Sequence, residues 1–247
     1  LNEDMLNYTH IPFEWAQTPS AIGYNLKANN FSNNIIVLDI YTEDVMYIDK
    51  ENFEWENSYY WRIQPVYRDS IGQWSDINSF SIGGIEFDLN PNIYSEEEFI
   101  NEYTFFGDWN NYRSSVIDIN GNEIWNSGNY GFMMNHIGEY GQIFGCSQMG
   151  APNNTGIEIS YDENVIWSAN QYIDQHDFRR ISNGNYMGFN QSTEFGPIPY
   201  GSWTSNFQSM GFEADAITEE FPFGAQRLNE FDSATGEILW SWDPHDY

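Results

Sequence analysis

One motif occurs three times in the second half of the chain. Each copy has an apolar run, a polar turn and a second run that ends in tryptophan, at residues 116–125, 157–167 and 228–240. In the first copy, Asn120 and Gly121 suit a tight hairpin, because such a turn requires positive φ. Trp125 and Trp167 lie 42 residues apart, which is the length of one β-propeller blade. The repeat therefore favours propeller blades over a solenoid or a sandwich.

The rest of the chain also reads as β-structure. Helical periodicity is confined to residues 94–103, where Ser95 suits an N-cap. Between residues 8 and 83, seven strand-like runs alternate with turns, a pattern and a length typical of a β-sandwich. We therefore expect an all-β protein, with a sandwich over residues 1–84 and an incomplete propeller of about three to four blades over residues 85–247.

Charge narrows the range of partners. The chain has 8 Lys and Arg against 37 Asp and Glu, a net charge of −29. Phosphate backbones and anionic lipids repel such a surface, so nucleic-acid binding through a basic face is excluded. No apolar run reaches the roughly 18 residues of a membrane span. The aromatic content of 18% is too high for an acidic disordered chain. An acidic, lysine-poor surface favours a saline, extracellular setting.

A histidine follows the tryptophan of every copy, namely His136, His176 and His245. In a propeller, the strand that begins each blade is the innermost, so side chains at its entrance converge on the axis. Histidines gathered there can bind a metal, transfer protons or act as nucleophiles. The alternative is that each histidine only caps a turn. The sequence alone leaves both interpretations open.

Residues 175–187 read Q-H-D-F-R-R-I-S-N-G-N-Y-M. This segment resembles the H-D-x-x-x-L-x-N-G-N-x-L segment of arylsulfotransferase-type propellers, and the D-x-x-G-x-I-x-W turns are similar to that family as well. Residues 8–83 resemble the fibronectin type III domains of secreted bacterial proteins. The resemblance implies a secreted or periplasmic protein with a six-bladed propeller.

The resemblance also implies a reaction, in which a sulfuryl group moves from an aryl sulfate to a phenol through a sulfohistidine, without a nucleotide cofactor. His176 would then orient the sulfate, and His245 would be a second active-site histidine. An arginine beside the sulfate would balance its charge. Arg179 and Arg180 are adjacent on an expected strand, so at most one of them faces the axis. Pairing with surface carboxylates is the favoured alternative for both.

A calcium site is a weaker possibility. Asp118, Asn120 and Asn122 have the alternate spacing of calcium ligands. Polar hairpin turns use the same residues, and we favour the turn. No other cofactor is expected.

Two departures from the family pattern limit the expectation of activity. Three repeats do not close six blades, and the nucleophilic histidine of that family lies in a later blade. We therefore expect this chain to be the N-terminal part of an enzyme, to receive its remaining blades from further sequence or a neighbouring chain, and to transfer no sulfuryl group by itself. The alternative is a non-catalytic extracellular adhesion or structural protein that forms oligomers or larger assemblies.

Overall fold

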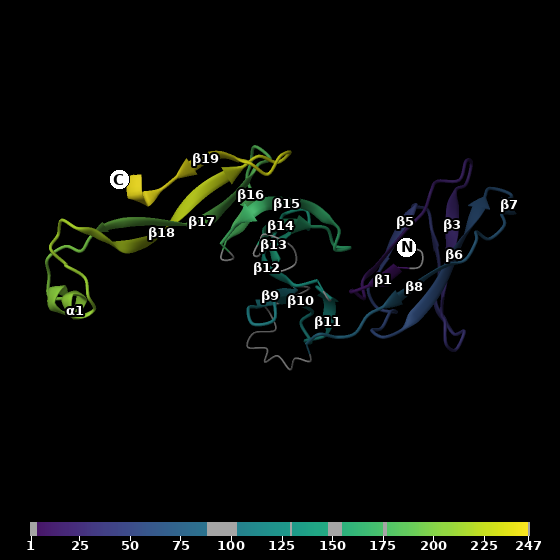
Figure 1. Ribbon diagram of the computed structural model, residues 1–247. Coiled ribbons are helices and arrows are strands. Elements are labelled where there is room, and N and C mark those ends of the chain that lie inside the picture. The colour runs from purple at the N-terminus through teal and green to yellow at the C-terminus, as the bar shows by residue number, and fades with distance from the viewer. Residues whose placement is uncertain (1–3, 88–102, 129, 148–154, 175–176, 247) are drawn as a thin grey trace. The chain divides into compact units, whose positions relative to one another are not determined.

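The computed structural model describes residues 4–87, 103–128, 130–147, 155–174 and 177–246 (Figure 1). The described residues form an all-β protein of several separate sheets, in which no closed barrel or propeller is present. Two compact units divide between Gly131 and Phe132. The expected helix at residues 94–103 lies almost wholly outside the described residues. No helix in the described part of the chain is long and apolar enough to span a membrane.

The first unit begins with eight strands. They are β1 (Asp4–Leu6), β2 (Ile11–Glu14), β3 (Gly23–Asn30), β4 (Ile36–Thr42), β5 (Met46–Asp49), β6 (Ser58–Tyr67), β7 (Ser70–Ile71) and β8 (Asn78–Ile82). One sheet has the order β1-β8-β6-β3-β4, with β7 paired to β6, and β2 and β5 form a second sheet. All pairs are antiparallel except β1 with β8.

Aromatic side chains join these two sheets. The Phe13 ring on β2 lies 5.2 Å from Trp61 on β6 and 6.1 Å from Phe80 on β8, and it also contacts Phe53. Trp61 is only 4% exposed, which confirms that it is a core residue. The alternation of apolar and polar residues along β6 explains this, because every second side chain faces the opposing sheet.

A third sheet also belongs to the first unit. It contains β9 (Thr104–Asp108), β10 (Arg113–Ile117) and β11 (Glu123–Asn126) in the order β11-β10-β9. Tyr8 forms a β-bridge with Trp125, and the Thr9 N–H donates to the Ile124 carbonyl at 2.9 Å. The boundary expected at residue 84 therefore falls inside this unit.

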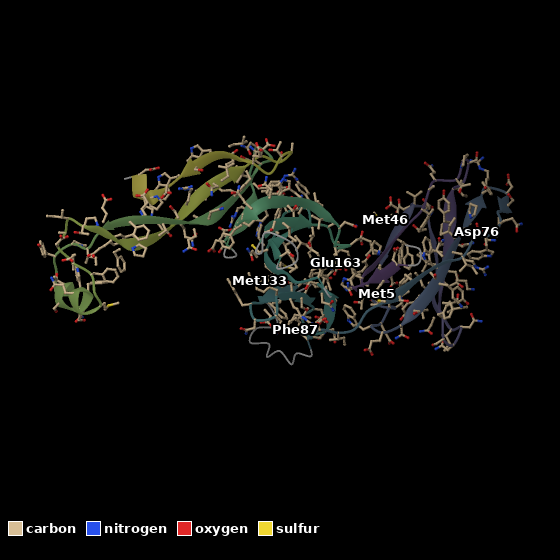
Figure 2. The ribbon with its side chains drawn as sticks, viewed as in Figure 1. Met5, Met46, Asp76, Phe87, Met133 and Glu163 are labelled. Atoms are coloured by element: carbon tan, nitrogen blue, oxygen red, sulfur yellow. The ribbon has the colours of Figure 1, made fainter. Side chains whose placement is uncertain are left out.

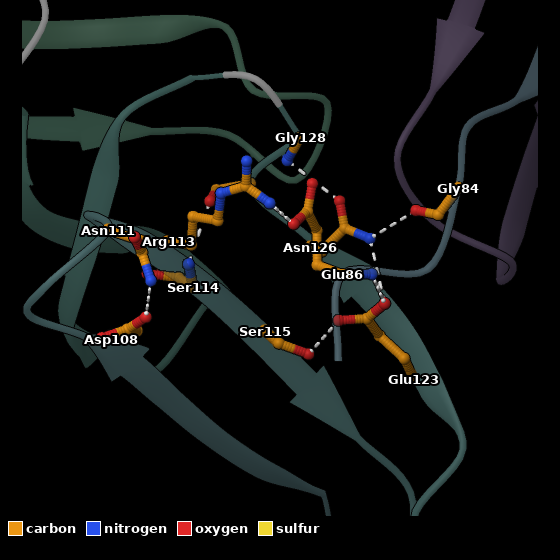
Figure 3. A network of polar contacts seen from close by, with 11 residues as sticks. Gly84, Glu86, Asp108, Asn111, Arg113, Ser114, Ser115, Glu123, Asn126 and Gly128 are labelled. Atoms are coloured by element: carbon orange, nitrogen blue, oxygen red, sulfur yellow. Dashed lines mark hydrogen bonds and ion pairs between the residues drawn. The ribbon is translucent and has the colours of Figure 1, made fainter. Parts of the chain in front are cut away.

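A buried carboxylate fastens the residues after β8 to the third sheet (Figure 3). Glu123 accepts hydrogen bonds from the Ser115 hydroxyl at 2.6 Å, the Glu86 N–H at 2.8 Å and the Asn126 amide at 3.1 Å. Arg113 forms an ion pair with Glu86. Burial raises the pKa of Glu123, although the bonds from Ser115 and Asn126 oppose that shift. The network therefore ties residues 84–86 to the third sheet.

The second unit holds two four-stranded antiparallel sheets. The first has β12 (Phe132–Ile137), β13 (Ile143–Ser147), β14 (Thr155–Ile159) and β15 (Val165–Tyr172) in sequential order. The second has β16 (Phe178–Arg180), β17 (Tyr186–Pro197), β18 (Glu219–Phe231) and β19 (Ile238–Trp242), also in sequential order. The short helices are α1 (Thr204–Ser209) and η1 (Pro244–Asp246).

The three predicted hairpins are confirmed, and their registers are equivalent. The tryptophan of each copy has an equivalent cross-strand partner, in the pairs Val116–Trp125, Glu158–Trp167 and Glu230–Trp240. A register shift follows each of these pairs. Gly121 has φ 84°, as its turn requires. The second turn can be followed in Figure 2, where Glu163 is labelled.

Trp167 is central to the core of the second unit. It is 8% exposed and stacks on Tyr186 at 3.9 Å and on Phe178 at 5.5 Å between ring centroids. Both partner rings come from the following sheet, on β17 and β16. The buried Glu158 carboxylate, directly opposite Trp167, accepts the Tyr186 hydroxyl at 2.5 Å. One sheet therefore covers the tryptophan of the sheet before it.

The β17–β18 hairpin is much longer than its neighbours. Its strands pair from Tyr186–Phe231 out to Pro197–Glu219, well beyond the ends of β16 and β19 (Figure 1). Helix α1 lies in the connection, where Phe207 contacts Phe221 at 5.2 Å. The sequence marks this segment as an insertion but does not predict the helix.

Candidate functional site

A cluster of polar side chains centres on Asp243, directly after β19. The Asp243 Oδ2 atom accepts the Ser192 hydroxyl at 2.7 Å and two guanidinium contacts from Arg227, Nε at 2.8 Å and Nη2 at 2.6 Å. The other carboxylate oxygen accepts the backbone N–H of His245 at 3.1 Å. The cluster therefore joins β17, β18 and η1.

Strand register places these groups together. Arg227 stands opposite Asn190, and Ser192 follows two residues later on β17, so all three side chains share one face. Asn229 lies on the same face and donates its amide to the Asn190 side-chain oxygen at 3.0 Å. The Ser241 hydroxyl donates to Asn229 at 2.7 Å. The cluster is thus the outer end of a hydrogen-bonded polar row across the sheet.

The environment keeps Asp243 ionised. The hydrogen bond from Ser192, with further help from the His245 N–H and from Arg227, lowers the pKa of Asp243 to about 2, against the opposing effect of burial. The carboxylate in turn holds one edge of the Arg227 guanidinium. The Nη1 atom on its other edge forms no hydrogen bond or ion pair with the described residues.

His245 presents an unused ring nitrogen. Its side chain is half-buried, and its Nε2 atom is shielded from solvent without a hydrogen-bond partner among the described residues. A buried polar atom without a partner costs free energy, so a ligand that bonds to it gains affinity. A guanidinium that a carboxylate holds on one edge suits an anion with several oxygens, such as a sulfate ester, on its other edge.

The other predicted histidines are not part of this cluster. His176 lies outside the described residues. His136 is on β12, half-buried, with its ring stacked on Phe144 at 5.9 Å between centroids. No hydrogen bond or ring contact joins His136 to His245 in the part of the chain that the structure describes.

Arg179 and Arg180 have separate surroundings. Arg179 is exposed and pairs with Asp177 at 3.1 Å. Arg180 donates to the Gly184 carbonyl at 3.1 Å and lies 5.6 Å from the centre of the Tyr186 ring. Asp243 links Arg227 to the segment of a predicted histidine, because its carboxylate accepts both the Arg227 guanidinium and the His245 backbone N–H. The sequence motifs did not indicate Arg227. Its only sequence signal is alternation with Asn229 along a predicted strand.

The calcium-like motif forms a hairpin turn. The Asp118 Oδ1 atom accepts the backbone N–H groups of Asn120 and Asn122, each at 2.8 Å, and Oδ2 accepts the Asn122 side-chain amide at 2.8 Å. These bonds occupy both carboxylate oxygens. Within the described ranges, no group of three or more His, Cys, Asp or Glu side chains is placed to hold a metal ion.

Comparisons with known proteins give no family. No protein-family model matches the sequence, and no curated protein matches it significantly. Among solved structures, a rhamnogalacturonan lyase of Bacillus licheniformis matches at 11% identity and an exotype rhamnogalacturonan lyase at 12%, both with a TM-score of 0.21. The alignments cover 98% and 99% of this chain but only 43% and 42% of those structures. A TM-score of 0.21 does not establish a shared fold.

Proposed function

We propose that this chain is part of an arylsulfotransferase-like protein, in which a fibronectin type III-like sandwich precedes propeller blades. In this proposal, the protein moves a sulfuryl group from an aryl sulfate to a phenol. One observation carries the proposal. His245 follows the third repeat, its backbone N–H bonds to the Asp243 carboxylate that also binds Arg227, and its Nε2 atom is buried without a hydrogen-bond partner among the described residues.

The hairpin registers support the blade interpretation. Equivalent cross-strand pairs and equivalent bulges recur in three successive sheets. Such regularity is typical of blades, each of which covers the face of the one before it. In the last sheet Trp240 and Trp242 remain 47% and 42% exposed. We propose that a further blade covers this face in the complete protein.

The chemistry assigns a binding role to the cluster. Transfer breaks the S–O bond of the aryl sulfate and forms an S–N bond to a neutral histidine, and the first phenol leaves as a phenolate. The oxygen of a second phenol then attacks the sulfur, the S–N bond breaks to regenerate the histidine, and the phenol proton passes to water. Negative charge stays on the three non-bridging oxygens throughout. In this proposal Arg227 and His245 bind those oxygens, and the nucleophile is a histidine of another blade.

The net charge of −29 opposes the approach of an aryl sulfate. Salt screens this repulsion, since the Debye length is about 3 Å at 1 M ionic strength. Asp243 does not add a free charge to the cluster, because it is paired with Arg227 at 2.6 Å. The proposal therefore requires that binding be measured in high salt, where the acidic surface contributes least.

The test is titration of the chain with 4-nitrophenyl sulfate in about 1 M NaCl, followed by ligand-observed NMR. We expect Arg227→Ala and His245→Ala to weaken binding at least fivefold. Arg179→Ala, an exposed arginine of the same sheet, is the matched control and leaves binding unchanged. Absence of binding, or an equal loss in the control, rejects the assigned site.

Turnover is measured separately, as release of 4-nitrophenol with phenol as the acceptor. We expect the isolated chain to release no more than buffer does, because the proposal places the nucleophile in another blade. Release above that background contradicts the need for further blades.

The exposed tryptophans of β19 also favour a second candidate, a non-catalytic extracellular protein that assembles through this face. Sedimentation velocity over a range of concentrations distinguishes it. An assembly protein self-associates, and Trp240→Ser reduces that association. A chain that stays monomeric at every concentration contradicts this candidate.

A further inference from the structure

The first unit contains a cavity of about 570 Å³ that shares no residue with the Asp243 cluster. Its walls come from the loop at residues 50–56 and from the β10–β11 turn, with His10 at the end of the segment before β2. Cavities of 300–1,000 Å³ are the usual size for small organic ligands. The sulfuryl-transfer proposal makes no use of this cavity.

The cavity has a fixed wall. The Trp55 Nε1–H donates to the Glu123 carbonyl at 2.8 Å, and the Glu123 carboxylate is held by the network in Figure 3. The Glu56 N–H donates to the Gly83 carbonyl at 2.8 Å. These bonds hold the half-buried indole in one orientation before any ligand arrives, which lowers the entropy cost of binding.

The rim of the cavity carries hydrogen-bond acceptors and a hydrogen-bond donor that have no partner among the described residues. The side chains of Glu51, Glu54 and Glu56 line the cavity, and their carboxylates make no hydrogen bond or ion pair with the described residues. Lys50 lines it too, and its ammonium group forms no ion pair with them either. The wall therefore offers strong acceptors and a strong donor that are free to bind a ligand.

The charge of the lining disfavours an anionic ligand. The acidic residues that line the cavity are Glu51, Glu54, Glu56, Asp118 and Glu123, against the single basic residue Lys50, so the wall repels an anion. A metal ion does not fit, because no group of ligands is placed to hold one among the described residues. A neutral ligand rich in hydroxyl groups can bond to the carboxylate acceptors and to the ammonium donor, since each hydroxyl donates one hydrogen bond and accepts others.

The apolar part of the wall suits the same ligand. The Trp55 ring, with its nitrogen already bonded, offers a flat face, and Ile85 beside it is 56% exposed. A pyranose ring has one face made of C–H groups, which packs on an indole, while its hydroxyls point outward to polar partners. We infer that this cavity binds a neutral saccharide, with Trp55 as the stacking platform and Glu51, Glu54 and Lys50 as hydrogen-bonding partners.

His10 adds a neutral polar group. Burial, and then the nearby charge of Lys50, lower the pKa of His10, while Asp118 and Asp49 oppose the shift. The lowered pKa favours the neutral imidazole, which both donates and accepts hydrogen bonds.

The test titrates the chain by calorimetry with cellotetraose, xylotetraose, mannotetraose and galactotetraose. Digalacturonate and spermidine are the anionic and cationic probes. We expect at least one neutral tetrasaccharide to bind, and Glu54→Gln and Lys50→Met to weaken that binding at least tenfold. Glu14→Gln, an exposed glutamate on β2, is the matched control and leaves binding unchanged.

Trp55→Ala should abolish binding, and Trp55→Phe should retain part of it, because phenylalanine keeps a flat apolar face. Circular dichroism checks that each variant is folded. If Trp55→Ala does not fold, the binding of Glu54→Gln and Lys50→Met decides the test. Failure of all four saccharides at 20 mM, preference for either charged probe, or equal losses in Glu14→Gln overturns the inference.

Discussion

The second and third copies of the hairpin share a register but differ in burial. Trp167 stands opposite Glu158 and is covered by the Phe178 and Tyr186 rings of the next sheet. Trp240 stands opposite Glu230 in the same register, yet nearly half of its surface is exposed. Met187 and Leu228 extend the apolar face around Trp240 by strand alternation.

A hairpin of this kind does not bury its own tryptophan. The bulge and the cross-strand pair are the same in both copies, and the turn of the third copy, residues 232–237, is one residue longer than that of the second, residues 160–164. Burial comes from the following sheet, so the face around Trp240 has the chemistry of an interior without a covering layer among the described residues. Equivalent substitutions in the two copies should therefore change the free energy of unfolding by different amounts.

The largest expected effect comes from truncating the two tryptophans. Trp167→Ala should lower the free energy of unfolding by about 3–5 kcal/mol, because it empties a packed aromatic site. Trp240→Ala should lower it by about 1 kcal/mol or less, since much of that surface already contacts water. Urea denaturation of both variants measures the difference. Equal losses would break the comparison.

A smaller effect is expected from the carboxylates opposite the tryptophans. Tyr186→Phe removes the hydroxyl that donates to Glu158, which is 1% exposed, and should cost about 1–3 kcal/mol. In the third copy, Asn183→Ala removes a donor to Glu230 at the surface and should cause no measurable loss. Thermal unfolding compares the two variants. If Asn183→Ala lowered the stability as much as Tyr186→Phe does, burial of the carboxylate would not explain the difference between the two copies.

A pH dependence is expected in the third copy. The pKa of Asp243 is about 2 in the folded chain and about 3.9 when unfolded. Its ionised form therefore stabilises the fold above pH 4, and this contribution is lost as the pH falls from about 4 to about 2. Asp243→Asn should flatten the stability curve over that interval, while Asp44→Asn, exposed in the first unit, should not. Unchanged curves in both variants would contradict the low pKa.

The secondary structure was largely predictable from the sequence. The second runs of the first and third copies, which end at Trp125 and Trp240, correspond to β11 (Glu123–Asn126) and β19 (Ile238–Trp242). The Asn120–Gly121 turn has the expected positive φ at Gly121. These features depend on alternation and turn chemistry, which act over a few residues and are therefore visible in the sequence.

The candidate site was predictable only in part. His245 was indicated by its place after the third tryptophan. Arg227 and Ser192 were not, because they meet Asp243 through the pairing of β17 with β18 across a long insertion. Register over such a distance is decided by the whole sheet and not by either strand alone.

The sequence by itself determined the all-β class, the three hairpins and the acidic surface, since each depends on composition or on neighbouring residues. Only the tertiary structure decided which tryptophan is buried, which arginine pairs with Asp243, and that Glu123 ties the third sheet to the residues directly after β8. The physical reason is that burial and buried ion pairs arise between segments far apart in the chain, where side chains exchange water for one another.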